Sequence, residues 1–146
     1  MLGVGSELKG DDASGVIVCK GLKEAFKKKG RSTKGIFLGG TAPENLTSEI
    51  KRFRPDTLII IDSADMNKRP GCVKLFNPDN ISQIAFSTHK LPLKIMIDYI
   101  QYFFDCRVIF IGIQPGSLVF GEYLTAPVNK AVKEIVKSLA LSIPVK

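Results

Sequence analysis

The first fifteen residues constrain the fold most, because they join an apolar start to a glycine-rich turn and then to an amphipathic segment. Gly3 and Gly5 let the backbone turn sharply or approach another group closely. Two adjacent carboxylates follow, Asp11 and Asp12, and the helix dipole stabilises acidic residues in a first helical turn. This order predicts a short strand over residues 1–4, a tight turn and a helix N-terminus. One aspartate would suffice as the cap of this helix, so the second aspartate needs another explanation.

The rest of the chain alternates helical and strand patterns. Apolar residues at helical spacing over about residues 12–29, with lysines opposite, predict an amphipathic helix that ends at Gly30. The β-branched run at residues 57–61 is typical of a parallel strand buried on both faces. Thr41 and Glu44 have capping-box spacing. Further strands are expected over residues 35–38, 72–76 and 107–113, and further helices over about 41–53, 91–104 and 125–139.

Strands that alternate with helices predict an α/β fold, a three-layer αβα sandwich around a mostly parallel twisted sheet. The segment at residues 72–76 is expected to add an antiparallel edge strand. With 146 residues, of which 45% are hydrophobic, the chain has the size and apolar content of one domain over residues 1–146.

Composition excludes several classes of protein. No apolar run approaches the roughly 20 residues of a membrane helix, and the start lacks the pattern of a signal peptide. We therefore expect a soluble, cytoplasmic protein with no membrane partner. Three cysteines, Cys19, Cys72 and Cys106, lie far apart, which argues against a disulfide framework or a thiolate metal site. We expect them to be small buried hydrophobic residues.

The formal net charge of +7 raises nucleic acid as a partner. Much of the excess lies between Lys20 and Lys34, on the exposed side and exit of the first predicted helix. The one aromatic residue there, Phe26, belongs to the apolar stripe of the helix, so no aromatic residues are interleaved among the lysines as stacking platforms. We therefore interpret the segment mainly as a solvated face, which could also steer an acidic protein partner, and we expect no nucleic-acid partner.

Three polar residues stand at the ends of predicted elements. Asp12 opens the first helix, Asp62 follows the buried strand, and His89, the only histidine, opens a later helix. In a doubly wound sheet these ends converge at one edge. Two carboxylates and an imidazole suit a divalent cation such as nickel or zinc. Each residue also has a plainer role as a turn former or cap, and spacing alone favours the plainer roles.

A resemblance over nearly the whole chain changes that balance. Five segments occur in order: residues 2–15 (LGVGSELKGDDASG), 39–41 (GGT), 61–63 (IDS), 87–89 (STH) and 112–115 (GIQP). Together they resemble the successive motifs of the nickel-iron hydrogenase maturation endopeptidases. The resemblance implies a three-layer αβα fold and a monomeric enzyme. It also implies the reaction, removal of a C-terminal extension from the hydrogenase large-subunit precursor once nickel has been inserted.

The resemblance also implies a metal site and catalytic residues, which fall on Asp12, Asp62 and His89. The first ligand of the family is the second member of the acidic pair, so Asp12 is preferred to Asp11. Ser6 departs from the family pattern, in which asparagine is common. The metal would polarise the scissile carbonyl and activate water. The resemblance implies that this metal is the nickel of the substrate, and the general base stays open, with Asp12 as the candidate.

Further residues are expected to bind the substrate: Gly39, Gly40, Thr41 and Gln114. Each has a bland alternative, since the first three could form a strand-to-helix turn and Gln114 a chain reversal. We favour a capping role for Thr41, leave Gly40 open and weigh the two roles of Gln114 equally.

Rival functions make different demands on the same residues. An aspartic dyad of Asp12 and Asp62 would leave His89 idle. A dinucleotide-binding module is disfavoured because its third glycine would arrive late, at Gly10, and because Asp11 would put negative charge where pyrophosphate binds. A basic nucleic-acid-binding protein and a non-catalytic docking protein for the precursor remain as alternatives.

Overall fold

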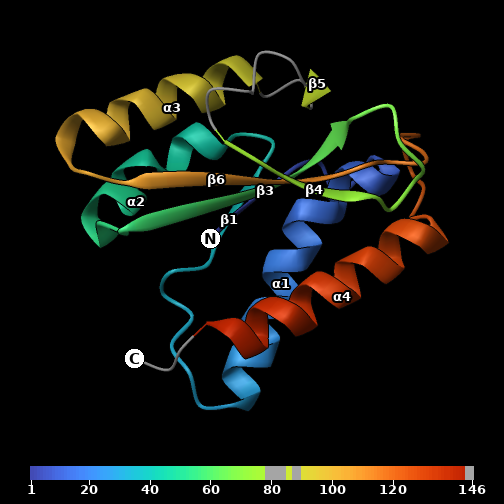
Figure 1. Cartoon of the computed structure of the whole chain (residues 1–146), viewed down its shortest axis with the longest axis horizontal. Coiled ribbons are helices and arrows are strands. Elements are labelled where there is room, and N and C mark those ends of the chain that lie inside the picture. Colours follow the sequence, from blue (N-terminus) through green and yellow to red (C-terminus); the bar gives the residue numbers. More distant parts are fainter. Residues whose placement is uncertain (78–84, 87–89, 144–146) are drawn as a thin grey trace.

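The structure, a computed structural model, describes residues 1–77, 85–86 and 90–143. Its main sheet has the strand order β2-β1-β3-β6-β4, and a short strand, β5, pairs with the end of β3 (Figure 1). The strands are β1 (Leu2–Val4), β2 (Phe37–Gly40), β3 (Thr57–Asp65), β4 (Val73–Phe76), β5 (Ala85–Phe86) and β6 (Arg107–Ile113). The helices are α1 (Ser14–Lys28), α2 (Thr47–Phe53), α3 (Lys90–Phe103) and α4 (Ala126–Ser142), with 3-10 turns η1 (Gly10–Ala13) and η2 (Pro43–Leu46).

The helices cover both faces of the sheet, as the sequence predicts. Helices α1 and α4 lie on one face, and α2 and α3 lie on the other (Figure 1). Alternate residues of β3 feed the two cores: Ile60 packs into the α2 and α3 side, and Ile61 into the α1 and α4 side. β1, β2, β3 and β6 are parallel, and β4 pairs antiparallel with β6. The predicted three-layer sandwich with an antiparallel edge strand is confirmed.

The order in which the chain adds strands to the sheet reverses beside β1. From β1 the chain passes to β2 on one side and later to β3 on the other, so β1 and β3 flank a topological switch point. The strand has only three residues, but Leu2 and Val4 are fully buried. Open α/β sheets bind ligands outside the carboxyl ends of the strands at such a point. This edge of the sheet is therefore the place to look for a site.

Several predicted boundaries need correction. The helix expected from Asp12 begins at Ser14, because residues 10–13 form a 3-10 turn. The predicted capping box at Thr41 is wrong: residue Ala42 precedes η2, and no side chain caps it. β3 continues to Asp65 rather than ending before Asp62, since its pairing with β6 persists and β5 joins its end. The strand expected at residues 35–38 is shifted to Phe37–Gly40.

The basic exit of α1 does more than meet solvent. Gly30, with φ of 64°, follows the helix, and the N–H of Arg31 donates to the Phe26 carbonyl at 2.9 Å, which closes the helix end. The Arg31 guanidinium then lies over the Phe26 ring and donates to the carbonyls of Ala140 and Ile143 at the end of α4. A cation at a helix C-terminus is favourable, so Arg31 ties the two helices together. The lysines at 27–29 are exposed, in line with a solvated face.

The described part of the chain contains no helix with both the length and the apolar character that crossing a membrane requires. All three cysteines are free. Cys19 and Cys106 are buried, as the sequence predicts, whereas Cys72 is half-buried. Burial raises the pKa of Cys19 to about 11 and also raises the pKa of Cys106.

These surroundings predict the order in which the thiols react. At pH 8, a thiol whose pKa lies about three units above the solution pH is roughly 0.1% thiolate, and the thiolate is the form that attacks the reagent. We expect an aromatic disulfide reagent to label Cys72 first and to leave Cys19 unmodified until the protein unfolds. Peptide mapping after timed labelling checks this order, and labelling in guanidinium is the control in which all three thiols react. Early modification of Cys19 in the folded protein would contradict its burial.

Candidate functional site

The candidate site lies where β1 stops and β3 continues. In the parallel register, Gly3 lies beside Ile61, so Val4, the last residue of β1, is level with Asp62. β3 runs on for three more residues, to Asp65. Beyond Asp62, therefore, β1 no longer accompanies β3, and the loop that follows β1 passes over the end of β3. A crevice at the switch point is the expected result.

Asp12 is fixed in this loop by its backbone and by two hydrogen bonds. Gly5 has φ of 128°, and a Cβ added there would lie only 1.8 Å from the Asp12 carbonyl oxygen, so only glycine allows this approach. The N–H of Ser6 donates to Asp12 Oδ2 at 2.8 Å, and the Ser63 hydroxyl donates to Asp12 Oδ1 at 2.9 Å. The residue is only 6% exposed. Asp12 is thus a buried carboxylate with a set orientation.

Asp62 lies on the strand next to this contact. It is 1% exposed and is paired in register with Gly112 of β6. Side chains alternate along a strand, so Asp62 shares the α2 and α3 face with Ile60 and Ala64, while Ser63 takes the opposite face. The structure therefore brings Asp12 to the residue that follows Asp62. The two carboxylates reach the end of β3 from its two sides.

The third predicted ligand, His89, lies outside the described residues. Its described neighbours along the chain are Phe86, which pairs with Ala64 near the end of β3, and Lys90, where α3 begins. Within residues 1–77, 85–86 and 90–143, no group of three or more His, Cys, Asp or Glu side chains is placed to hold a metal ion. The three-ligand site stays a prediction, of which the structure describes two members.

Asp11 has a different role from Asp12. Its carboxylate accepts four hydrogen bonds: the N–H groups of Gly116, Ser117 and Thr125 donate at 2.7, 3.0 and 2.7 Å, and the Thr125 hydroxyl at 2.8 Å. Thr125 immediately precedes α4, so the charge lies at the N-terminal end of that helix, where the dipole favours an anion. Asp11 is fully buried and fixes the loop between β6 and α4.

The two aspartates differ in the capacity that they have left. An ionised carboxylate offers about four lone-pair positions. Asp11 accepts four hydrogen bonds within the fold, three on Oδ2 and one on Oδ1, whereas Asp12 accepts two, one on each oxygen. Asp12 therefore keeps more capacity than Asp11 to bind a cation or a water molecule. This geometry supports the choice of Asp12 over Asp11.

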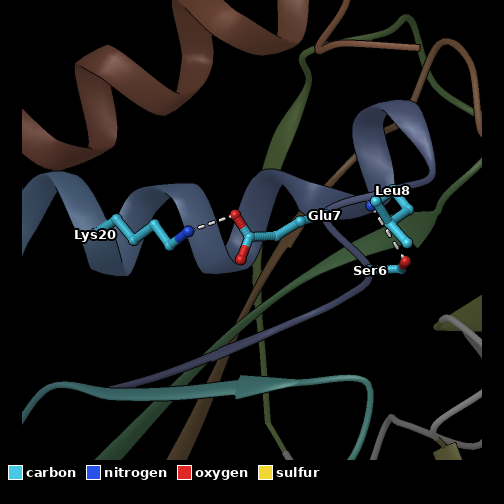
Figure 2. A network of polar contacts seen from close by, with 4 residues as sticks. All are labelled: Ser6, Glu7, Leu8 and Lys20. Atoms are coloured by element: carbon cyan, nitrogen blue, oxygen red, sulfur yellow. Dashed lines mark hydrogen bonds and ion pairs between the residues drawn. The ribbon is translucent and has the colours of Figure 1, made fainter. Parts of the chain in front are cut away.

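The turn that leads to Asp12 is held against α1. Figure 2 shows Lys20 of α1 reaching Glu7, and the N–H of Leu8 directed at the Ser6 hydroxyl oxygen at 3.3 Å. The ion pair is exposed and contributes little to stability by itself.

Gly39, Gly40 and Thr41 end β2 at the same edge of the sheet. Gly40 has φ of 56°, a conformation that favours glycine, and a Cβ added there would meet nothing within 4 Å. Its carbonyl accepts the N–H of Gly5 at 2.9 Å, so it is tied to the loop of the site. Gly39 is packed closely against β1, and Thr41 is exposed. Of the three, Gly40 adjoins open space next to the site.

Gln114 is occupied by the loop after β3. Its side-chain oxygen accepts the N–H groups of Met66 and Lys68 at 2.7 and 3.2 Å, and its amide nitrogen donates to Asp65 at 3.2 Å. The residue is 7% exposed. These hydrogen bonds satisfy the polar atoms of the buried Gln114 side chain within the fold. Its contact with substrate stays a prediction.

An open pocket of about 520 Å³ lies elsewhere, between η2 with α2 on one side and α3 on the other. None of the residues that line it is a predicted site residue; they are Glu44, Thr47, Ser48, Pro92, Ile95, Met96 and Tyr99. Its walls are mostly apolar and carry one carboxylate. The volume of the pocket therefore does not identify the chemical site.

The sequence did not single out Ser63 as part of the site or reveal the role of Asp11. Ser63 lies on the same face of β3 as Ile59 and Ile61, and a polar residue that follows these two on one face was a usable signal. Nothing local marks Asp11, because its partners lie more than a hundred residues away. Only the fold brings that contact about.

The contacts of Asp11 predict a stability test. In Asp11→Asn the amide would turn a donor toward backbone N–H groups, which leaves buried donors unpaired, so we expect a loss of about 2–4 kcal/mol of unfolding free energy. Urea denaturation followed by circular dichroism measures the change. Asp105→Asn is the matched control, because Asp105 is exposed, and it should change stability by less than about 1 kcal/mol. Equal stability of Asp11→Asn and the unsubstituted protein would contradict the role of Asp11 in holding the loop between β6 and α4.

Comparisons with known proteins agree with the predicted family. The family model for hydrogenase maturation proteases, HycI, matches residues 16–142. The hydrogenase 3 maturation protease of Escherichia coli strain K12 is 35% identical over 140 residues, which cover 95% of this chain and 86% of the relative. The crystal structure of a NiFe hydrogenase maturation protease HycI from Thermococcus kodakarensis KOD1 aligns with a TM-score of 0.83 at 30% identity. That alignment covers 96% of this chain and 88% of the other.

The solution structure of the endopeptidase HycI from Escherichia coli gives a TM-score of 0.78 at 33% identity, over 95% of this chain and 86% of the other. Sequence family, relatives and fold thus point the same way, and the predicted family is confirmed. The chain belongs to the hydrogenase maturation protease family and is an endopeptidase of that family.

Proposed function

We propose that this endopeptidase removes the C-terminal extension of a nickel-loaded precursor of a hydrogenase large subunit. The observation that carries the proposal is the Asp12 carboxylate, which is buried at the switch point, held by Ser6 and Ser63, and left with free lone pairs beside the strand of Asp62. The names of the relatives support the substrate class, because they refer to maturation of hydrogenase 3 and of NiFe hydrogenase.

In this proposal Asp12, Asp62 and His89 meet the nickel that arrives with the substrate. The donor chemistry of these three residue types fits, since carboxylate oxygens together with an imidazole nitrogen suit a borderline divalent ion. Three protein ligands leave further positions for a substrate carbonyl or a water molecule. Bound nickel would act as a Lewis acid on the scissile carbonyl and lower the pKa of a coordinated water.

The residues of the chain would prepare this site before the substrate arrives. The Ser63 hydroxyl and the Ser6 N–H orient the Asp12 carboxylate, so that little reorganisation is needed when the metal binds. Gln114 holds the loop after β3 through Met66 and Lys68, which keeps the mouth of the crevice in shape. Of the two carboxylates, Asp12 is the candidate general base.

The substrate segment would pass beside Gly40. Open space adjoins this residue, and its carbonyl is tied to Gly5 in the loop that carries Asp12. An extended peptide could lie along such a surface with its backbone close to the glycine. Gly39 supports this turn because it packs against β1, and the exposed Thr41 borders the turn. Action as a monomer in the cytoplasm completes the proposal.

The three ligands give the first test. Asp12→Asn, Asp62→Asn and His89→Ala should each lower cleavage of the nickel-loaded precursor at least about 100-fold, because each removes a donor from the metal. Asp98→Asn on α3 is the control, since Asp98 is exposed and pairs with Lys94 at the surface of that helix. Gel analysis of the released C-terminal peptide measures the rate. High activity of His89→Ala would instead favour a carboxylate dyad.

A second test concerns the free enzyme. We expect it to bind nickel weakly, because it offers few ligands, no thiolate and carboxylates already engaged in hydrogen bonds. Equilibrium dialysis against nickel should give a dissociation constant above micromolar values. Tight retention of one nickel ion per chain would overturn the view that the metal comes from the substrate.

A further inference from the structure

We propose that an apolar patch on two joined loops docks the folded body of the precursor while its C-terminal segment enters the site. The patch consists of Leu8, Leu118, Val119, Phe120 and Tyr123, and we call it the loop patch. This inference rests on the proposed function and identifies the surface by which the protein substrate is held. It concerns residues outside the proposed ligand set.

The side chains of the loop patch are unusually exposed for their size. Tyr123 is 93% exposed, Phe120 71% and Leu8 61%. Single exposed apolar residues are ordinary, but a gathering of large ones on neighbouring loops marks an interaction surface. Aromatic side chains bury roughly 150–250 Å² each when covered, so the five residues together offer on the order of 600 Å².

The two loops are held together as one body. The N–H of Gly10 donates to the Glu122 carbonyl at 3.2 Å, and the N–H of Gly121 donates to the Leu8 carbonyl at 2.8 Å. The N–H of Asp11 donates to the Ser117 carbonyl at 2.9 Å, and the Asp11 carboxylate binds the same loop. The loop patch is therefore formed before any partner binds, which lowers the entropic cost of docking.

The loop patch is continuous with the candidate site. Leu8 and Asp12 belong to the same segment after β1, and residues 118–123 follow β6, whose carboxyl end lies at the same edge of the sheet. Figure 1 shows η1 and the segment before α4 side by side at this end of the molecule. A protein that covered the loop patch would hold its own chain end next to the crevice.

The area favours a transient partner over a second copy of this chain. A stable interface buries about 800 Å² on each partner, and interfaces below about 1,200 Å² in total are typical of transient complexes. The loop patch, with on the order of 600 Å² on one side, falls at that boundary. A protease must release its large product, so a transient complex suits its substrate.

Two variants of the chain test the loop patch. The first is the double substitution Phe120→Ser with Tyr123→Ser, and the second, Val119→Asp, places a charge within the loop patch. The matched control pairs Tyr102→Ser with Leu141→Ser, because these side chains are also strongly exposed, 84% and 69%, but lie near the far ends of α3 and α4. Circular dichroism confirms that each variant is folded. Cleavage of nickel-loaded precursor is measured over a range of precursor concentrations.

We expect both loop-patch variants to raise KM for the precursor at least about tenfold with kcat changed less than about threefold, and the control to match the unsubstituted protein. Unchanged KM in folded loop-patch variants would overturn the docking role. So would a dimer of the unsubstituted protein, seen by sedimentation, that the same variants dissociate. If the unsubstituted protein does not cleave the precursor at all, the proposed function fails, and the docking inference fails with it.

Discussion

The hydrogen bond from the Ser63 hydroxyl to the Asp12 carboxylate is the contact on which the candidate site depends, because it joins the loop after β1 to the end of β3. Backbone packing makes this contact possible: Gly5 allows the Asp12 backbone to approach β1, where any side chain would collide. The switch point provides the crevice, and the glycine turn allows the loop that carries Asp12 to extend to it. A serine and a glycine thus decide where the carboxylate points.

The acidic pair divides two tasks between adjacent residues. Asp11 accepts four hydrogen bonds from the loop before α4, and Asp12 accepts two and keeps more of its capacity for the crevice. Because they are neighbours, the residue that stabilises the fold also fixes the backbone of the residue assigned to chemistry. The hydrogen bonds of Asp11 also join the two apolar loops at the edge of the sheet, so these loops are tied to the segment that carries Asp12.

Much of the fold follows from local patterns in the sequence. The β-branched and apolar runs predict β6 at its observed bounds, and helical spacing places α3 within one residue at each end. Other features did not follow from local patterns. Thr41 has capping-box spacing, but the chain enters a 3-10 turn at Pro43 instead. The lysine-rich exit of α1 reads as a solvated face, yet Arg31 there caps α4, more than a hundred residues away. For the site, element ends led to the prediction of Asp12 and Asp62 as ligands, while the role of Asp11 could come only from tertiary contacts.

The central claim is that Asp12, Asp62 and His89 bind one metal ion. Anomalous diffraction from crystals soaked in a millimolar concentration of cadmium or nickel tests it most directly, since such a concentration fills a weak site. The account predicts one peak in the crevice, with oxygen atoms of Asp12 and Asp62 and a ring nitrogen of His89 all within direct coordination distance. A peak bound to only one of the three, or to Asp11 instead, would contradict it.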